Sequence, residues 1–414
     1  MKVAIGGVAI AGGGIVGLAL ALRLHANGID CRVYEAAPAF KHIGAGVTLL
    51  PHAMREITAL GLEAEVVAHG IENRESAFYN RFGQRIFAEK RGRFADYPFP
   101  EIGIHRGSLH AVLRDAVIRR MGAETIVNDC QIVDLEQDDS GVRLQAKRLS
   151  DGAALPTIKA AMVIACDGVN SLIRKKYYPD EQIVFTGINT WRGLTVRPPI
   201  LDGRTYFRIG SINTGKIVIY PLADNVDSQG SQLINWIAEL KNDTHTPNDW
   251  NKPGSAKDFI HIFESFKFDW LDVGELIRTA DSILEYPMVD KDPVGRWTFG
   301  RVTFAGDAAH PMYPRGSNGV AQGLIDTREL VDALLANSDA PAALKAYEAV
   351  RIPATAKVVR TNRSTPPDVI NLKVEELVGD KPFDNLDSII SQDELRAFSE
   401  QYSRIAGFSQ SAFT

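Results

Sequence analysis

Three short runs of apolar residues, widely separated along the chain, each end at a turn rich in glycine or aspartate. The runs are Val8–Ala11, Met162–Ala165 and Val302–Ala305. Continuous apolar runs of this length are typical of strands buried inside a parallel sheet. After the first run, Ile15–Asn27 predicts a helix that stops at Gly28, and Cys31–Glu35 predicts a second strand. This βαβ start predicts an α/β fold with a parallel central sheet, to which all three runs contribute.

The middle of the chain has a different pattern, in which apolar and polar residues alternate. A hairpin is predicted over Ser76–Lys90, with its turn at Gly83. Four further strands are predicted at Thr190–Val196, Thr205–Ile209, Lys216–Leu222 and Gln232–Glu239. Alternation is typical of antiparallel strands that are exposed on one face. We therefore expect a second, sheet-rich domain that is inserted into the first in two pieces.

Segments outside these strands have helical or loop patterns. Helices are predicted at Gly319–Asn337, at Pro341–Thr361 with an interruption at Pro353, and near Gln392–Ile405. The polar segment Asn242–Pro253 predicts a loop.

Composition narrows the class of protein. The chain has 414 residues, of which 45% are hydrophobic and 23% charged, as in ordinary globular proteins of two or three domains. Its 46 basic and 51 acidic residues give a net charge of −5 without basic blocks, which argues against nucleic-acid binding. The three cysteines, Cys31, Cys130 and Cys166, are too few for a disulfide scaffold. This sparse, odd number indicates a reducing, cytoplasmic location.

The uncharged segment Val3–Leu22 follows Lys2 and has the length of a membrane anchor or of a signal-peptide core. Six of its twenty residues are glycine, however, and each glycine weakens a helix by about 1 kcal/mol relative to alanine. A strand, a tight turn and a buried helix therefore explain the segment better, and we expect no membrane segment.

The first turn contains the pattern Gly12-x-Gly14-x-x-Gly17. The first glycine permits a tight turn, the second lets the backbone approach a pyrophosphate, and the third lets the helix pack close to the strand. Glu35 ends the next strand, eighteen residues after Gly17, where an acid accepts hydrogen bonds from ribose hydroxyls. The pattern predicts a dinucleotide site but does not separate NAD from FAD.

Two more acidic turns follow the other apolar runs. Asp167-Gly168 lies in Cys166–Arg174, and Asp307 lies in Gly306–Pro311, which leads into the glycine-rich segment Pro314–Gly319. An acid at a strand end can bind polyol hydroxyls, and a helix start can direct N–H groups at the electron-rich edge of a reduced flavin. Taken singly, each acid is as readily explained as a helix cap. Three such turns after three buried strands favour a flavin site.

The motifs GGGIVG…E, ACDGVNSLIR and GDAAHPMYPRGSNG resemble those of the single-component FAD-dependent aromatic hydroxylases, which include salicylate and p-hydroxybenzoate hydroxylases. The resemblance covers about Val8 to Pro353. Thr190–Gly193, Asn235-Trp236, Asp249–Asn251 and Tyr286–Asp290 are most similar to the phenazine-carboxylate hydroxylase branch. The resemblance implies a Rossmann-like FAD-binding domain, an inserted antiparallel β-sheet domain for the substrate and a helical C-terminal segment. The implied division is 1–75, 101–185 and 286–365 for FAD, 76–100 and 186–285 for the substrate, and 366–414 for the tail.

The resemblance also assigns cofactor roles. It implies that Gly12, Gly14 and Gly17 hold the FAD pyrophosphate, that Glu35 holds the adenosine ribose, and that Arg106 contacts the diphosphate–ribityl region. Asp167 lies in a motif associated with FAD and reduced nicotinamide, Asp307 is expected on the ribityl chain, and Gly316–Gly319 beside the pyrimidine edge. Gly44–Val47 would pass near the isoalloxazine ring. The predicted cofactor residues further include Ile15, Val16, Ala36, Gly46, Val47, Gly168, Gly306, Gly316, Asn318 and Gly319.

In the resembled family, NADH or NADPH reduces FAD, and the reduced flavin reacts with O2 to give a C4a-hydroperoxyflavin that hydroxylates an aromatic ring. The chain has no second GxGxxG, so the nicotinamide is expected to bind transiently. The resemblance implies hydroxylation of an aromatic or N-heteroaromatic small molecule, carboxylated or phenolic, by a monomer or homodimer. We expect no nucleic acid, membrane or metal partner.

Substrate residues are expected on the inserted domain. Trp191, Trp236 and Tyr286 are candidates for the pocket wall, although core packing is the more common role of each aromatic taken singly. Tyr220 is a candidate for a hydrogen bond to a substrate hydroxyl, and Arg192 can pair with a carboxylate of the substrate or of the protein. Pro314 is expected above the flavin. Arg315 departs from the apolar residue of related phenazine enzymes and places a cation beside the flavin.

No catalytic base is identified, because His105 and His310 are both expected to be structural. Three other functions remain open. An NAD-dependent dehydrogenase would leave the Asp167 and Asp307 motifs unexplained. A flavin oxidase or reductase, and a non-catalytic flavin-bound sensor, would use the same motifs without inserting oxygen.

Overall fold

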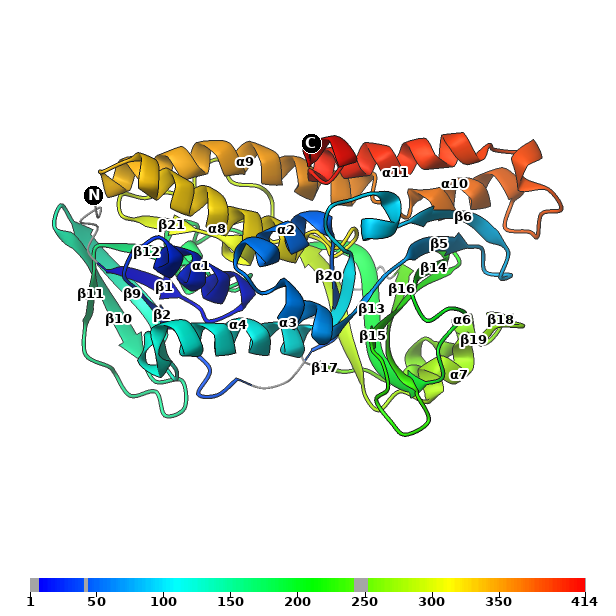
Figure 1. Cartoon of the computed structure of the whole chain (residues 1–414), viewed down its shortest axis with the longest axis horizontal. Helices are drawn as coiled ribbons and strands as arrows, with labels where there is room; N and C mark the ends of the chain where they lie inside the picture. The colour runs from blue at the N-terminus through cyan, green and yellow to red at the C-terminus, as the bar shows by residue number, and fades with distance from the viewer. Residues whose placement is uncertain (1–6, 41–43, 242–251, 414) are drawn as a thin grey trace.

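The computed structural model describes residues 7–40, 44–241 and 252–413. Figure 1 shows two lobes side by side, a small parallel sheet with its helices in one and a large sheet in the other, and long helices that run across both. The central sheet of the first lobe has the order β21-β12-β1-β2-β8, and every neighbouring pair in it is parallel. Its strands are β1 (Val8–Ala11), β2 (Cys31–Tyr34), β8 (Ile126–Val127), β12 (Met162–Ala165) and β21 (Val302–Phe304).

This arrangement confirms that the three apolar runs are neighbouring strands, with the N-terminal strand β1 between β2 and β12. Val8 pairs with Met162, and Val163 pairs with Val302, so chain segments up to 300 residues apart meet in one sheet. Because the strands are parallel, the turns that follow β1, β12 and β21 all lie at the same edge. The polar motifs at those turns are therefore brought together by the sheet.

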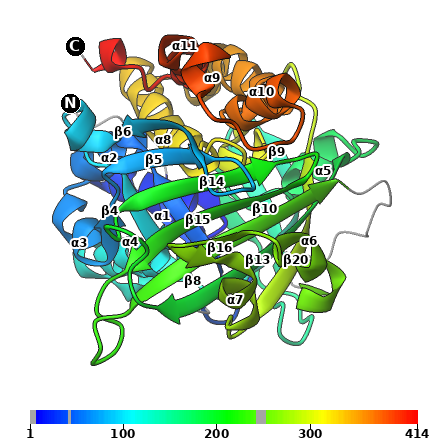
Figure 2. The same cartoon turned by 90° about the vertical axis from the view of Figure 1, so that its right-hand side faces the viewer.

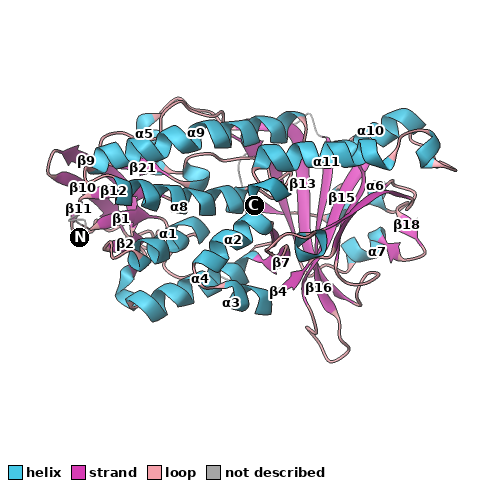
Figure 3. Ribbon diagram, turned by 45° about the horizontal axis from the view of Figure 1, so that its top comes forward, coloured by secondary structure: helices cyan, strands magenta, loops and turns pink. Residues whose placement is uncertain are grey.

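Helices cover this sheet, as Figure 3 shows. Helix α1 (Ile15–Ala26) is buried along most of its length because its residues are almost all apolar or glycine. Helices α4 (Arg106–Met121) and α8 (Gly319–Ala336) pack against α1, and α9 (Ala340–Ser364) packs against α8. Shorter helices are α2 (Pro51–Ala59), α3 (Glu63–Ala68) and α5 (Leu172–Tyr177).

Two small antiparallel sheets were not predicted. One consists of β9 (Gln131–Asp138), β10 (Gly141–Lys147) and β11 (Ile158–Ala160). The other consists of β3 (Gly46–Leu49), β7 (Ile102–His105) and β4 (Gly70–Glu72). The second matters for the site, because β3 lies against the large sheet of the other lobe.

The large sheet has the order β17-β20-β13-β16-β15-β14-β5-β6, and Figure 2 shows it from the end of the molecule. Its strands are β5 (Glu75–Tyr79), β6 (Arg85–Lys90), β13 (Val184–Arg197), β14 (Thr205–Ser211), β15 (Gly215–Ala223), β16 (Gln232–Lys241), β17 (Lys252–Pro253) and β20 (Ile283–Asp290). The predicted hairpin thus joins the later strands through a parallel β5–β14 pair. The predicted domain boundary at residue 286 lies inside β20.

One face of this sheet is covered by α6 (Ile260–Phe263), α7 (Val273–Arg278) and a cluster of phenylalanines around them. The two-stranded β18 (Lys267–Phe268) and β19 (Leu271–Asp272) complete this cover. The opposite face is turned toward the first lobe, and Gly46 of β3 contacts it there. Residues that alternate along each strand therefore divide into a core set and a set that faces the first lobe.

The structure corrects two helix and loop predictions. Helix α9 continues through Pro353. Residues on both sides of the proline, among them Tyr347 and Val358, are buried, and their packing offsets the free energy of the backbone hydrogen bond that proline cannot make. Of the predicted loop Asn242–Pro253, residues 242–251 lie outside the described residues, and Lys252–Pro253 forms β17.

The C-terminal tail contributes α10 (Val369–Val378) and α11 (Gln392–Ala406), the second of which was predicted. Helix α10 packs with Phe78 and Phe87 of the large sheet, and the capping box of Ser391 and Glu394 starts α11. No helix in the described part of the chain is long and apolar enough to span a membrane.

Candidate functional site

The turn after β1 has the geometry that its three glycines predict. Gly12 has a φ of +103°, and a Cβ there would lie 2.5 Å from the carbonyl oxygen of Cys166. A Cβ on Gly17 would collide with the carbonyl oxygen of Gly12, so only glycine lets α1 sit this close to the turn. Gly14, by contrast, has no atom within 4 Å of its Cβ position. The open space at Gly14 is where a ligand can reach the backbone.

The start of α1 is available for an anion. Gly14 is its N-cap and supplies no side-chain hydrogen bond, so the N–H groups of the first turn, which begins at Ile15, lack a protein cap. Glu35 lies beside this turn and accepts hydrogen bonds from the N–H groups of Gly13 (2.6 Å) and Ala37 (2.8 Å), with Ala36 between. Each carboxylate oxygen has a second lone pair, which leaves the acid able to accept from ribose hydroxyls.

The three motifs form one site. The Gly12 turn packs against Cys166 and Asp167. Val16, on the first turn of α1, lies against Gly306, where a Cβ would be 2.9 Å from the Val16 Cγ2. The ends of β1, β12 and β21 therefore surround the same space, as the three acidic or glycine-rich turns predicted.

Asp167 has a carboxylate oxygen that no protein group satisfies. Its Oδ2 accepts a hydrogen bond from the Leu172 N–H (3.1 Å), whereas its Oδ1 is buried without a partner. Burial raises the pKa of Asp167 to about 6, an effect that hydrogen bonds from Ser171 and from backbone groups partly offset. Gly168 follows with a φ of +80°. An orphaned acceptor at this edge fits a ligand that supplies a hydroxyl or amide donor.

A buried ion network stabilises the third motif, residues 306–311. Asp326 of α8 accepts from the Gly306 N–H (2.8 Å), from Arg351 Nε (2.7 Å) and lies 2.6 Å from His310 Nε2. These contacts keep the pKa of Asp326 below its usual value despite complete burial. His310 is therefore structural, as expected. Asp307 itself is exposed, and its Oδ1 is 4.0 Å from the Cβ position of Gly319 at the start of α8.

The segment Pro314–Gly319, here called the flavin-edge loop after the role that the resemblance predicts for it, is positioned by side chains from other elements. Asn318 donates to the Gly316 carbonyl (3.0 Å) and to Tyr402 Oη (2.8 Å), and its Oδ1 lies 2.9 Å from His52 Nε2. Gly316 has a φ of +119°, and a Cβ there would collide with the Tyr402 hydroxyl. Tyr402 also donates to Asn362 (2.7 Å). Residues of α2, α9 and α11 thus fix this loop, and no motif pointed to them.

Strand β3 connects the cofactor side to the large sheet. The Gly46 N–H donates to Asn235 Oδ1 (2.8 Å), and a Cβ on Gly46 would be 2.9 Å from the Tyr220 ring. Val47 follows in the same strand. Arg106 is the first residue of α4, with an exposed side chain next to Gly44, and its N–H donates to the Ala45 carbonyl (3.2 Å). These residues adjoin the Gly12 turn through His110, whose Nε2 is 2.7 Å from the Gly13 carbonyl.

The predicted substrate residues divide between the two faces of the large sheet. Tyr220 and Arg192 face the first lobe, and the Arg192 guanidinium lies 5.2 Å from the Tyr286 ring centroid. Trp191 and Trp236 lie on the opposite face, where both rings pack with Phe259. The prediction that these tryptophans line the substrate pocket is therefore corrected, because strand alternation directs them into the core.

Tyr220 is buried between its neighbours, with its ring stacked on Tyr206 at 4.9 Å. Burial raises the pKa of Tyr220, so its hydroxyl stays protonated at neutral pH and cannot serve as a base. It remains available as a hydrogen-bonding group.

Arg315 is not a free cation. Its Nη2 donates to Asp368 (2.6 Å), which also binds Lys216 Nζ (2.9 Å), and Lys216 in turn binds Glu239 (2.9 Å). These four buried groups carry two positive and two negative charges. The expectation that Arg315 adds positive charge beside the flavin is therefore corrected, because Asp368, which precedes α10, neutralises it. Pro314, before it, is exposed.

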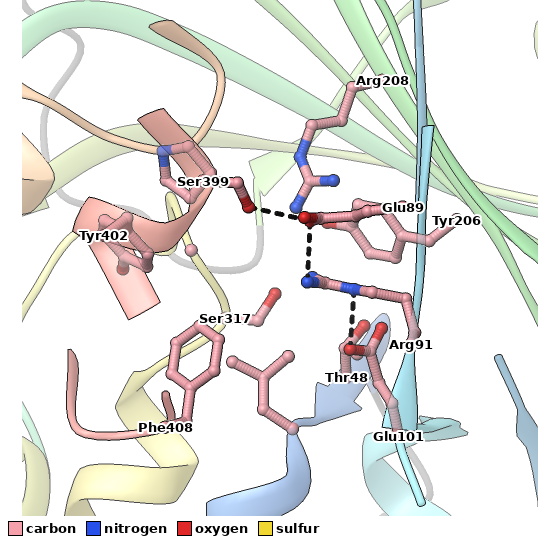
Figure 4. Close-up of a pocket in the computed structure, with 13 residues that line it drawn as sticks. Thr48, Glu89, Arg91, Glu101, Tyr206, Arg208, Ser317, Ser399, Tyr402 and Phe408 are labelled. Atoms are coloured by element: carbon pink, nitrogen blue, oxygen red, sulfur yellow. Dashed lines mark hydrogen bonds and ion pairs between the residues drawn. The ribbon is translucent and has the colours of Figure 1, made fainter. Parts of the chain in front are cut away.

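A small pocket, partly open to solvent, lies between the large sheet, β3, the flavin-edge loop and α11. Figure 4 shows Arg208, Tyr206, Thr48 and Ser317 around it. Arg91 lies at one side, with its guanidinium between Glu89 and Glu101, each 3.0 Å away. No local pattern in the sequence predicted this pocket, since its walls come from segments as far apart as Thr48 and Phe408.

Comparison with known proteins agrees with this geometry. The FAD binding domain family matches residues 7–243 and 286–362. The phenazine 1,6-dicarboxylic acid hydroxylase of Lysobacter antibioticus is 38% identical over 361 residues, which cover 86% of this chain and 89% of that protein. The 3-amino-4-hydroxybenzoate 2-monooxygenase PtnB3 of Streptomyces platensis is 32% identical over 372 residues, 86% of each chain.

Solved structures have the same fold. The Klebsiella pneumoniae HpxO complex with FAD and uric acid superposes with a TM-score of 0.77 at 21% identity, over 98% of this chain and 97% of that one. A salicylate hydroxylase substrate complex gives a TM-score of 0.73 at 23% identity, over 99% and 97%. The predicted p-hydroxybenzoate hydroxylase-like fold is thereby confirmed.

Proposed function

Because this chain belongs to the FAD binding domain family and is a class A, FAD-dependent aromatic hydroxylase with NAD(P)H as electron donor, we propose that its substrate is an aromatic carboxylate bound against the large sheet. Two relatives above 30% identity are named for acids, a phenazine dicarboxylic acid and an aminohydroxybenzoate. We extend this chemistry to the present chain on the strength of its own residues.

The observation that carries the proposal is the buried guanidinium of Arg208. Arg208 is 6% exposed and lines the pocket beside the flavin-edge loop. It donates to the Ser76 hydroxyl and lies near the rings of Phe78 and Tyr206. No carboxylate of the described residues is within ion-pair distance of it. A buried guanidinium is costly unless it is paired, and a carboxylate on the ligand supplies the pair.

When bound, FAD supplies the oxygen-activating chemistry, and the chain's own residues hold and orient the reactants. The Gly14 turn and the start of α1 bind phosphate, Asp167 accepts a hydrogen bond, and Gly46 and the flavin-edge loop border the space for the ring. Val218 and Ile237, which belong to one apolar cluster on this face, would form a floor that excludes water, and Tyr220 would hydrogen-bond a substrate hydroxyl. The proposal includes O2 as co-substrate, a transient NADH or NADPH, a monomer or homodimer, and a cytoplasmic location.

The test compares phenazine-1-carboxylate with uncharged phenazine in the purified FAD-bound enzyme. For Arg208→Gln we expect KM for the acid to rise about 10- to 100-fold, because a hydrogen bond to a charged group contributes about 1.5–3 kcal/mol. The response to phenazine should be unchanged, as should FAD content. Arg204→Gln is the matched control, since Arg204 lies before the same strand and pairs with Asp224 at the surface. Equal effects on both ligands, or no hydroxylated product from any aromatic acid tried, would contradict the proposal.

A further inference from the structure

A second arginine, the half-buried Arg192, stands in the same row of the large sheet as Arg208. Arg192 pairs with Ile237 across β13 and β16, Ile237 pairs with Val218 across β16 and β15, and Val218 pairs with Arg208 across β15 and β14. Directly paired residues project to the same face. Across the strands, the row therefore consists of Arg192, Ile237, Val218 and Arg208. Two apolar residues lie between two cations.

Arg192, like Arg208, has no carboxylate partner among the described residues. Within the described part of the chain, its Nε is buried without a hydrogen-bond partner, and its guanidinium lies beside the Tyr286 ring. The other cations of this face differ. Lys216 and Arg315 share Asp368, and Arg91 binds Glu89 and Glu101. The sequence left two partners open for Arg192, a carboxylate of the substrate or a carboxylate of the protein. Among the described residues, no protein carboxylate pairs with it.

The row lies between the two places where the cofactor lobe reaches the sheet. On one side, Tyr220 and Asn235 contact Gly46 of β3. On the other, Lys216 binds Asp368, which holds Arg315 of the flavin-edge loop. Val218 lies midway between Lys216 and Tyr220 along β15. A ligand on this row therefore faces the space between β3 and the flavin-edge loop.

The spacing of the guanidiniums requires a long ligand. Three inter-strand distances of about 4.8 Å place the Cα atoms of Arg192 and Arg208 roughly 14 Å apart. Both side chains also lean outward, since Arg192 lies against Tyr286 of β20 and Arg208 against Ser76 of β5. One carboxylate cannot reach both, whereas acids at opposite ends of an extended aromatic can.

We propose that this row is a two-ended anion site, in which Arg192 and Arg208 each bind one carboxylate of a planar aromatic dicarboxylate whose rings cover Ile237 and Val218. The inference rests on the proposed function, because the ligand is the substrate of that site. It adds that a second acid is recognised and which residue recognises it.

The test is a binding titration of the FAD-bound enzyme with phenazine-1-carboxylate and with phenazine-1,6-dicarboxylate, followed by the flavin absorption spectrum. Wild type should bind the diacid at least about tenfold more tightly than the monoacid, as one additional charge-assisted hydrogen bond allows. Arg192→Gln should remove this preference while leaving monoacid affinity within about twofold. Arg192→Lys should restore part of it, and Arg204→Gln should change nothing.

The outcomes separate this inference from the proposed function. If the monoacid is bound and hydroxylated but the diacid has no advantage, or if Arg192→Gln keeps the advantage, the two-ended site is wrong and the proposed function stands. If neither acid perturbs the flavin spectrum, the proposed function fails first. If Arg192→Gln weakens FAD retention instead of diacid binding, the guanidinium serves the cofactor, and the inference is overturned. Unfolding curves of each variant confirm that the fold is intact.

Discussion

The proposed cofactor cradle, formed by the turns after β1, β12 and β21, and the proposed substrate face of the large sheet are built by opposite means. In the cradle, the protein presents backbone N–H groups, glycines without room for a Cβ, and the ends of three parallel strands. On the sheet face it presents long charged and aromatic side chains from β13, β14, β15 and β16. The cradle therefore tolerates almost no change in shape, while the face can change its chemistry without changing the fold.

This contrast gives each region its own function. Backbone groups bind a phosphate-containing cofactor in the same way whatever the substrate is, since every chain has them. Side chains that alternate along strands can be exchanged singly, and each exchange alters the charge or shape of one point on the pocket floor. The unpaired guanidiniums of Arg192 and Arg208 belong to the second kind. Lys216 on the same face and Arg315 of the flavin-edge loop hold the two regions together through Asp368.

The largest expected effect on FAD retention tests the rigidity of the cradle. Gly17→Ala places a methyl group on the carbonyl oxygen of Gly12 and must displace the turn or α1. Alanine ordinarily stabilises a helix by about 1 kcal/mol relative to glycine, so a loss here has the opposite sign from helix propensity. We expect FAD retention to fall about 5- to 150-fold, as overpacking costs about 1–3 kcal/mol. Absorbance of the purified protein at flavin wavelengths measures it.

Gly295→Ala is the matched control, because its Cβ position has no atom within 4 Å and its backbone is not left-handed. It should retain FAD as the wild type does. A Gly17→Ala enzyme as yellow as the control would show that the cradle is more adaptable than its packing indicates.

The same contrast explains what could be predicted from the sequence. Gly12, Asp167 and Asp307 stand in contiguous motifs directly after apolar runs, so local pattern was enough to bring them together. Trp191 and Trp236 were misplaced because a strand's sequence does not say which of its two faces meets the cofactor lobe. Register between strands and packing of the tail decide that.

Residues that act across the fold had no local signal at all. Arg208 becomes notable only when no carboxylate is found near it, and Tyr402 only when its hydroxyl is seen against the flavin-edge loop. The family match ends at residue 362, whereas Asp368 and Tyr402 lie beyond it. A pattern that describes the family's cofactor motifs therefore omits part of what positions the loop.

At Gly306–Pro311, the third motif, the expected effect is on the free energy of unfolding rather than on FAD retention. Arg351→Met removes the guanidinium that neutralises buried Asp326, on which the Gly306 turn and His310 depend. Breaking a buried ion pair costs about 3–5 kcal/mol, so the free energy of unfolding in urea should fall by that amount. Arg328→Met, which breaks a pair nearer the surface, should cost about 1 kcal/mol or less. Equal losses of unfolding free energy in the two variants would mean that the buried Arg351–Asp326 pair stabilises the fold no more than the pairs of Arg328 do.

The smallest effect is a pH dependence at the flavin-edge loop, where side chains rather than backbone complete the cradle. Complete burial lowers the pKa of His52 to about 3, and its ring is bound to Asn318 and stacked on Phe408. An unfolded histidine has a pKa near 6.5, so between about pH 6.5 and 3 the unfolded chain takes up a proton that the native protein does not. Native stability due to His52 is therefore lost as pH falls, by up to about 1.4 kcal/mol per pH unit.

Asp167 contributes the opposite slope, since its raised pKa makes the native state bind a proton more readily than the unfolded chain. Comparing His52→Gln with wild type at each pH isolates the histidine. Urea unfolding at pH 7.5 and 5.5 should show the wild type losing about 1 kcal/mol more than His52→Gln, whereas His25→Gln, at an exposed position of α1, should follow the wild type. Parallel losses in all three proteins would show that His52 is hydrated or protonated in the native state. The loop would then be held more loosely than the glycine-lined turn that it faces, and the contrast between the two regions would extend into the cradle itself.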